Sequence, residues 1–290
     1  MDDQKAKAYA KRFERVFAYI EQHLDEPLSV EQLSRVAYFS KFHFHRQFSQ
    51  YVGLGVGAYV RQLRLKRASY QLVFGRERVI DIALAAGFES PEAFARAFRQ
   101  AIGQSPSQFR RSPMWQPWDE RLRLPPRPRS EKMDVKVIEF GKTKVAVFEH
   151  RGAPERVNDS VKTFIEWRKT SGLSPVKTSR SFGLVYGDPD TAVPEEFRFD
   201  ICGEVSEFVP ENPQGVTNGV IPAGRCAVLR HLGSHDRLAE SIYPLYREWL
   251  PQSGEDVRDF PLFFHYLNLF PEVAEHELVT DIYLPLKASV

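Results

Sequence analysis

Apolar residues recur at helical spacing through roughly the first 110 residues of the chain and alternate with polar residues beyond residue 132. A repeat of three to four residues is typical of an amphipathic helix, and a repeat of two is typical of a half-buried strand. The clearest helical stripe consists of Phe13, Val16, Phe17, Ile20 and Leu24. The pattern therefore predicts a helical N-terminal domain followed by a domain that contains a β-sheet.

The helical part nearly repeats itself with an offset of 50 residues. Each copy, residues 29–53 and residues 79–103, reads as a short helix, a tight turn and a second helix that opens at a serine. Internal repetition of this kind marks a duplicated supersecondary unit, here two helix-turn-helix units. The residue pairs that define the offset are Ser40 and Ser90, Phe44 and Phe94, Arg46 and Arg96, Phe48 and Phe98, Gly53 and Gly103, and Tyr59 and Phe109.

Spacing within each copy assigns a buried face and a free face to each helix. Two phenylalanines one turn apart in the second helix of each copy are expected in the core. Ser40 and Ser90 are expected to cap those helices by accepting an orphan backbone N–H. Gly87 suits the turn of the second copy. The residues expected to bury the short first helices are Val30, Leu33, Val36 and Ala37 in the first copy and Ile82, Ala83 and Ala86 in the second.

The second copy, "IDIALAAGFESPEAFARAFRQAIGQSPSQFRR" at residues 80–111, resembles the DNA-binding domain of the AraC/XylS family of bacterial transcription regulators. The resemblance covers about residues 10–112 and implies a long helix at about 56–73 that holds two helices for adjacent major-groove segments. Glu92 departs from the neutral polar residue often found at its position and would repel phosphate. The DNA-contacting residues that the resemblance and the free helix faces predict are Ser40, Lys41, Phe42, His45, Arg46, Ser90, Glu92 and Arg96.

The charge distribution separates the two parts of the chain. Residues 1–130 contain 22 Lys and Arg against 13 Asp and Glu, and the remaining 160 residues contain 18 against 25, giving net charges of +9 and −7. A basic domain suits double-stranded DNA, and an acidic domain does not. The charged N-terminus lacks the apolar run of a signal peptide, and no stretch is long and apolar enough to cross a bilayer. We therefore expect a cytoplasmic protein.

A stretch with five prolines between residues 112 and 130 predicts a linker, with domains at residues 1–112 and 132–290 on either side of the linker at 113–131. Beyond it, motifs repeat with an offset of about 81 residues, as in "AVFEHRG" at 146–152 and "AVLRHLG" at 227–233. The expected fold is an α+β domain of two strand-helix-strand-strand repeats related by a pseudo-twofold. The expected strands lie at 135–140, 144–150, 180–187, 198–205, 225–233, 262–267 and 278–286, and the helices at 159–172 and 238–254.

This second half resembles the GyrI-like effector-binding domain over about residues 133–287, most specifically in "IPAGRCAVLRHLG", "YREWLPQSG" and "HELVTDIYLPLK". The domain order looks like the Rob group of regulators. The resemblance implies a groove between the repeats that binds a small, aromatic or cationic molecule. Phe264 stands where the family commonly has glutamate, which weakens cation binding and hydrolysis. The predicted ligand-binding residues are Trp167, Tyr186, Glu204, Trp249, Phe264 and Tyr266.

Two alternatives for the second domain stay open: a small-molecule hydrolase, or a module that binds a protein partner, with RNA polymerase as one further partner to consider. We expect no enzyme activity and no cofactor. His231 and His235 stand four residues apart, but Gly233 between them and the absence of a third ligand argue against a metal site. His150 occupies the repeat position of His231, which indicates a structural role for both.

Overall fold

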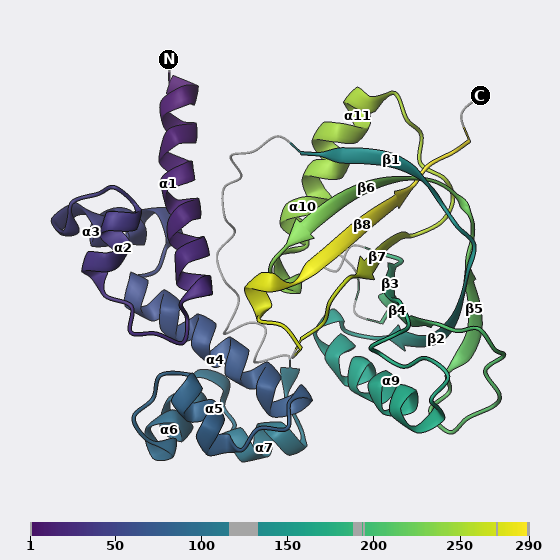
Figure 1. Ribbon diagram of the computed structural model, residues 1–290, viewed down its shortest axis with the longest axis horizontal. Helices are drawn as coiled ribbons and strands as arrows, with labels where there is room; N and C mark the ends of the chain where they lie inside the picture. The colour runs from purple at the N-terminus through teal and green to yellow at the C-terminus, as the bar shows by residue number, and fades with distance from the viewer. Residues whose placement is uncertain (1, 116–132, 188–192, 194, 271, 289–290) are drawn as a thin grey trace. The chain divides into compact units, whose positions relative to one another are not determined.

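The computed structural model describes residues 2–115, 133–187, 193, 195–270 and 272–288, without the side chains of residues 2–8 and 42. Most of the expected linker lies outside these residues. The chain divides into a helical unit, Met1–Lys132 with Phe270–His276, and a sheet unit, Met133–Leu269 with Glu277–Val290. Each unit is described by itself (Figure 1).

Helices near the predicted positions build the helical unit. The short first helix and the second helix of each copy follow the duplicated pattern. The long connecting helix runs one residue beyond its expected end. Trp115, from the start of the expected linker, is buried in the second core beside Phe109 (ring centroids 5.1 Å apart). The helices are α1 (Asp2–Gln22), α2 (Val30–Val36), α3 (Lys41–Val52), α4 (Val56–Phe74), α5 (Val79–Ala85), α6 (Pro91–Ile102) and α7 (Pro106–Arg111). We call the second helices of the two copies, α3 and α6, the reading helices.

Two separate cores lie along α4. Its first half contributes Tyr59 and Leu63 to the core of the first copy, and its second half contributes Leu65 and Leu72 to the core of the second. The apolar stripe of α1 is buried as predicted. Val30 is a correction, because its side chain is 38% exposed at the first position of α2.

The turns of the two helix-turn-helix copies differ in length, although the overall offset between the copies is 50 residues. Helices α2 and α5 are offset by 49 residues and the reading helices by 50, because the second turn contains one additional residue. Gly87 takes a left-handed φ of +75° there, whereas Tyr38 takes φ of +53° at the matching place of the first turn. Ser90 caps α6 by accepting from the Ala93 N–H, as predicted. The predicted cap of α3 is wrong, because the Ser40 side chain makes no capping hydrogen bond.

The sheet unit contains one antiparallel eight-stranded sheet of order β1-β6-β8-β7-β3-β4-β2-β5 (Figure 1). The strands are β1 (Val135–Phe140), β2 (Thr143–Arg151), β3 (Ser181–Val185), β4 (Arg198–Glu204), β5 (Thr217–Ile221), β6 (Gly224–Leu232), β7 (Leu262–Tyr266) and β8 (Val279–Pro285). The helices are η1 (Pro154–Arg156), α9 (Val157–Ser171), η2 (His235–Arg237), α10 (Ala239–Pro244), the π-helical η3 (Leu245–Trp249) and α11 (Leu250–Ser253). A further short helix, η4 (Glu275–Glu277), begins in the segment assigned to the helical unit and ends at the first residue of the sheet unit's last segment.

Each repeat gives its first strand to the other repeat. Strand β1 pairs with β6 of the second repeat, and β5 pairs with β2 of the first. The remaining strands follow the predicted strand-helix-strand-strand order twice and meet where β7 pairs with β3. Strand β5 was not predicted, because this edge strand is mostly exposed and only its last two residues are large and apolar.

The sheet has one face covered by helices and one opposite face, and strand register assigns residues to each. Gly183 of β3 lies opposite Phe264 of β7, so both face the same side. Residues from α10, η3 and α11 pack on Phe264 in one cluster, and residues of α9 pack with Ile201 in another. Phe182, Phe263 and Tyr283 form a third cluster on the opposite face.

Candidate functional site

Buried phenylalanines fix the orientation of both reading helices. Phe44 and Phe48 of α3 and Phe94 and Phe98 of α6 are all fully buried. Because residues three and four apart share one side of a helix, the remaining sides of α3 and α6 face solvent. Glycines with left-handed φ, Gly53 and Gly103, end both helices.

Arg46 and Arg96 occupy matching places on these exposed sides. Both side chains are exposed, and in the described part of the chain neither makes an ion pair. Arg35 on α2, in contrast, pairs with Glu31 at 2.7 Å. Arginine presents a planar array of donors that can bind guanine bidentately in the major groove. The two arginines therefore have the exposure and freedom that base reading requires.

The other predicted DNA-contacting residues fall into three groups. Lys41, His45 and Glu92 are exposed, and the His45 Nε2 atom lies beside the turn at Gly55, 3.7 Å from where a Cβ would stand. Ser40 is exposed without capping, whereas Ser90 is engaged as a cap. Phe42 lies in α3, but its side chain is outside the described part of the structure.

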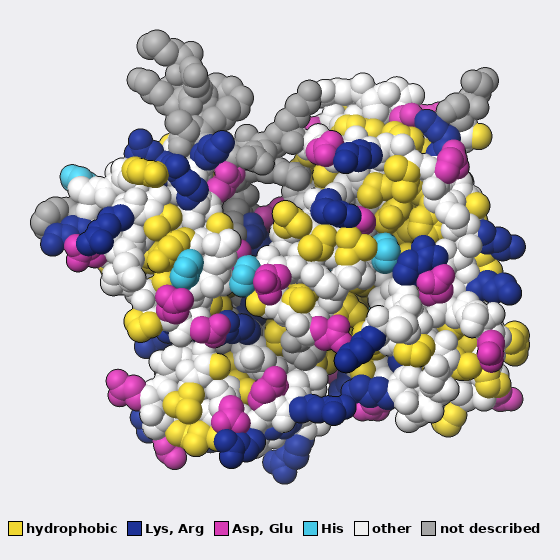
Figure 2. All heavy atoms as spheres, viewed as in Figure 1, with side chains coloured by type: hydrophobic (Ala, Val, Ile, Leu, Met, Phe, Trp, Pro, Cys, Tyr) yellow, Lys and Arg dark blue, Asp and Glu magenta, His cyan; other side chains and the backbone are white. Residues whose placement is uncertain are grey.

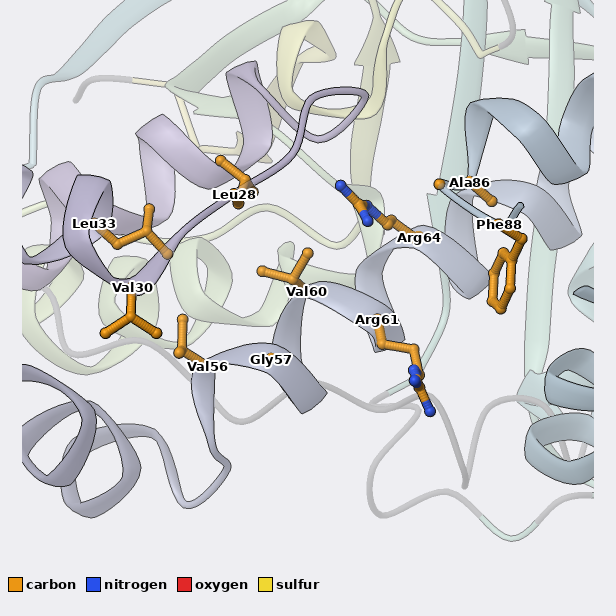
Figure 3. Close-up of a pocket in the computed structure, with 11 residues that line it drawn as sticks. Leu28, Val30, Leu33, Val56, Gly57, Val60, Arg61, Arg64, Ala86 and Phe88 are labelled. Atoms are coloured by element: carbon orange, nitrogen blue, oxygen red, sulfur yellow. The ribbon is translucent and has the colours of Figure 1, made fainter. Parts of the chain in front are cut away.

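Two further exposed arginines of the helical unit were not predicted. Arg99 lies one turn beyond Arg96 on α6, and the helical spacing of the two residues was the signal for it. Arg61 of α4 lines a cavity of about 320 Å³ whose walls come from both helix-turn-helix copies, with Val30 and Leu33 on one side and Phe88 on the other (Figure 3). Figure 2 shows Lys and Arg side chains on the viewed surface of the helical unit, interspersed with Asp and Glu.

Three of the six predicted ligand-binding residues come together on the helix-covered face of the sheet. Trp249, Phe264 and Tyr266 share a cluster with Phe199, which we call the effector cluster. Phe264 is 5% exposed, and the other three side chains are partly buried. Phe199 also joins the neighbouring cluster that contains Trp167, which is 2% exposed and stacked on Phe164.

The rings of this cluster fill the centre of the sheet. A Cβ added at Gly183 would lie 2.5 Å from Phe199 Cζ and 2.7 Å from the Tyr266 hydroxyl. The space above Gly183 is therefore already occupied by aromatic side chains. Of the two cavities described, one lies in the helical unit, and the other, of about 420 Å³, lies beside the loop that follows α9. A molecule placed above Gly183 would have to displace these rings.

Tyr186 and Glu204 do not join this cluster, so the six predicted ligand-binding residues do not meet in one place. Glu204 lies opposite Val145, a member of the cluster on the other face of the sheet. It accepts two hydrogen bonds of 2.8 Å from Arg180, which also hold the pKa of its carboxyl below the ordinary value. Tyr186 is 43% exposed and lies under the guanidinium of Arg198 at 4.0 Å.

His235 is a polar residue next to the effector cluster that the sequence analysis considered only as a metal ligand. Its ring lies 4.8 Å from the ring of Tyr266. Its Nε2 atom is buried and has no hydrogen-bond partner in the described structure. Burial lowers the pKa of His235 to about 4, so the imidazole is neutral at physiological pH. A sequence does not display an enclosed ring nitrogen, because the enclosure depends on tertiary packing.

His150 and His231 make the same contacts in the two repeats. Nδ1 lies 2.8 Å from the Ser160 hydroxyl in the first repeat and 2.9 Å from the Ser241 hydroxyl in the second. Nε2 faces a backbone carbonyl in both, so it carries the proton and donates. Each histidine thus ties the end of a strand to the helix that follows, which is a structural role. Within the described residues, no cluster of three or more His, Cys, Asp or Glu could hold a metal ion.

Comparison with known proteins gives two domain matches. Residues 133–287 match the GyrI-like small molecule binding domain, and residues 33–112 match a helix-turn-helix domain. The first match spans more than half of the chain. The chain therefore belongs to the GyrI-like family and combines this domain with a helix-turn-helix domain of the AraC type. It is a transcription regulator, and both predicted resemblances are confirmed.

Each of the following three relatives is similar over one part of the chain. The probable transcriptional regulator YgiV of Escherichia coli K12 is 50% identical over 154 residues, covering 53% of this chain and 96% of YgiV. The transcriptional regulator Rob of Salmonella typhimurium is 38% identical over 97 residues, covering 33% of this chain and 34% of Rob. The EcmrR C-terminal domain, a crystal structure, is 16% identical with a TM-score of 0.44, covering 54% of this chain and 99% of that domain.

In the part of the chain that the structure describes, no helix combines the length and the apolar character needed to span a membrane.

Proposed function

We propose that the helical unit reads a specific double-stranded DNA sequence with α3 and α6, and that Arg46 and Arg96 supply most of the selectivity. Lys41, His45 and Arg99 add contacts from the same exposed helix sides. Glu92 can accept a hydrogen bond from cytosine, which distinguishes the second half-site from the first.

A single observation carries this proposal: two unpaired, exposed arginines stand at matching places on two helices of a duplicated unit. Solvated arginines are common on helix surfaces, and one alone would carry little weight. The duplication makes an accidental match improbable, because the buried faces of both helices are fixed by phenylalanines at the same spacing. Two exposed helices with matching arginines suit a chain that contacts two major-groove segments.

The test begins with an operator selected from random-sequence DNA by the full chain. Arg46→Ala and Arg96→Ala are each expected to weaken binding to this operator by about 1–3 kcal/mol and to relax selection at the contacted bases. Binding to unrelated DNA should change little. Arg35→Ala is the matched control, because Arg35 is exposed on α2 and already paired with Glu31. Equal losses on operator and unrelated DNA would refute base reading by these arginines.

We further propose that the sheet unit senses a small aromatic molecule through the effector cluster. Large, partly buried rings at Phe199, Trp249 and Tyr266 offer area for stacking. The family to which the chain belongs supports a small-molecule role. The effector changes DNA affinity only if it binds the active and inactive states with different affinities.

The experiment is a screen of the full chain's melting temperature against aromatic compounds, with each compound recovered for mass analysis. A reproducible rise is expected with the compound intact. Trp249→Ala should abolish the rise, and Tyr186→Ala, on the opposite face, should preserve it. A chemically altered compound would move the sheet unit into the hydrolase class. No response to any compound would favour a protein partner, with RNA polymerase the first to titrate.

A further inference from the structure

No member of the effector cluster carries a negative charge, because all of them are apolar or aromatic. Asp236, next to His235 in the sequence, is exposed. Glu204 lies on the opposite face and is bound to Arg180. Glu240, near the start of α10, pairs with Arg237 at 2.6 Å. An organic cation moved into this cluster would lose its hydration without gaining a counter-charge, which is strongly unfavourable.

The imidazole of His235 is a polar group beside the cluster. Its neighbour Tyr266 belongs to the cluster, and the two rings are 4.8 Å apart. A neutral imidazole has one nitrogen that donates and one that accepts. The enclosed Nε2 fills neither role, and a buried polar atom without a partner destabilises the folded protein. A ligand that supplies the missing partner recovers that loss on binding.

The group best suited to supply this partner is a hydroxyl. A hydroxyl donates to an unprotonated Nε2 and accepts from a protonated one, so it satisfies either tautomer. An ammonium group only donates and brings an unpaired charge. A ketone only accepts and fits one tautomer. An aromatic ring that carries a hydroxyl can stack in the cluster and place the oxygen beside His235.

We propose that the effector cluster takes a neutral aromatic molecule bearing a hydroxyl group, and that His235 recognises the hydroxyl through Nε2. This inference rests on the proposed function of the cluster as an effector site. It assigns the ligand class and adds His235 as the residue that determines specificity. The aromatic members of the cluster set the affinity for the ring, and His235 sets the preference for the hydroxyl.

Three naphthalene compounds of similar size test the proposal on the full chain by calorimetric titration at pH 7. They are 2-naphthol, 2-methylnaphthalene without the hydroxyl, and the cation 1-naphthylmethylammonium. We expect 2-naphthol to bind roughly tenfold more tightly than 2-methylnaphthalene, the size expected for one buried hydrogen bond. The cation should bind most weakly of the three.

Two variants of His235 separate recognition from folding. His235→Phe keeps a ring against Tyr266 and should bind 2-naphthol and 2-methylnaphthalene equally. His235→Gln keeps a donor and an acceptor and should retain part of the preference. If His235→Phe does not fold, the comparison of His235→Gln with the original chain still measures the preference. Phe264→Glu is the converse change and should raise affinity for the cation above that for 2-naphthol.

The outcomes distinguish failure of this inference from failure of the effector site itself. If the compounds bind with Trp249-dependent affinity but 2-naphthol holds no advantage over 2-methylnaphthalene, the role of His235 is refuted and the site stands. Tighter binding of the cation refutes the neutral ligand class. If none of the three compounds binds and the wider screen also finds no ligand, both the inference and the effector site are refuted.

Discussion

Both units of this protein contain a duplication, but the copies are joined in opposite ways. In the helical unit each copy keeps its own core, and the two cores share only the helix α4. In the sheet unit the copies exchange their first strands and complete one continuous sheet. A copy with its own core can change its local structure without affecting the other copy. Copies that share one sheet cannot, because a change in one alters the pairing of the other.

The local details follow this contrast. The two helix-turn-helix copies differ in turn length, in the residue at the left-handed position and in capping. The two sheet repeats preserve the same histidine–serine contact after an exchange of strands. Two independent copies suit a DNA-binding unit whose halves contact different base sequences. Two repeats joined in one sheet suit a binding domain in which residues of both repeats surround one cluster.

Truncation of the cores should give the largest effect. Phe48→Ala and Phe98→Ala each remove a fully buried ring, and each should cost about 3–5 kcal/mol of unfolding free energy. Hydrogen exchange should show lost protection mainly in the copy that carries the change, because the cores are separate. Phe263→Ala should cost a similar amount but expose both repeats, because β7 pairs with β3 across the repeat boundary.

The corresponding control is the unaltered copy within each helical variant. Protection of α6 in Phe48→Ala, and of α3 in Phe98→Ala, should stay close to that of the original chain. A uniform loss of protection over both copies in either variant would contradict the independence of the two cores.

A change in pH should destabilise the second sheet repeat through His235. Burial, together with the nearby His231, lowers the pKa of His235 to about 4 from an ordinary 6.5, and Asp236 opposes this. The unfolded chain therefore binds a proton at His235 at higher pH than the folded chain. Above about pH 6.5 His235 is neutral in both the folded and the unfolded chain, and its titration costs no stability. As the pH falls towards 4, protonation of the unfolded chain lowers the free energy of unfolding by about 3 kcal/mol in total.

The first repeat has Pro154 at the position of His235, so the residue that causes this loss of stability occurs in the second repeat alone. Urea unfolding at pH 7 and pH 4.5 should show it as a difference between the original chain and His235→Phe. A variant with the same pH dependence as the original chain would contradict the assignment to His235.

Most features that depend on local spacing were predictable from the sequence, and the Ser40 cap and the burial of Val30 were the exceptions. The four phenylalanines of the reading helices are buried because their spacing places each pair on one side of a helix. The exposed Arg46 and Arg96 then follow as residues on the remaining sides. Both duplications were visible for the same reason, since a repeated unit preserves spacing.

Features that depend on pairing between distant segments were not predictable in this way. Alternation shows that Tyr186 and Val185 point to opposite faces, but only the pairing of β3 with β7 shows which face holds Phe264. In the same way, only the pairing of β4 with β2 shows that Glu204 lies opposite Val145. The β5 strand lacks an apolar run, because its role is to complete the other repeat's sheet edge. The enclosed Nε2 of His235 results from packing among separate segments.

The turn of the second helix-turn-helix copy should tolerate change less than the first. Gly87→Ala places a Cβ at φ of +75° and 2.5 Å from Arg64 Nη1. Arg64 has little freedom to move, because it donates to the carbonyls of Leu24 and Glu26. We expect a loss of about 2 kcal/mol by chemical denaturation. Tyr38→Gly is the reverse change in the first turn and should be neutral or slightly stabilising.

The smallest expected effect comes from the same substitution made at matching positions, the N-cap serines of the two helix-turn-helix copies. It therefore compares the two copies directly. Ser90→Ala removes the oxygen that accepts from the Ala93 N–H, and it should cost about 1 kcal/mol. Ser40→Ala should cost close to nothing, because the Ser40 side chain forms no cap. Thermal unfolding of the two variants under identical conditions measures the difference. Equal losses would mean that Ser40 also caps its helix in solution, and the divergence of the two copies would then lie in their turns alone.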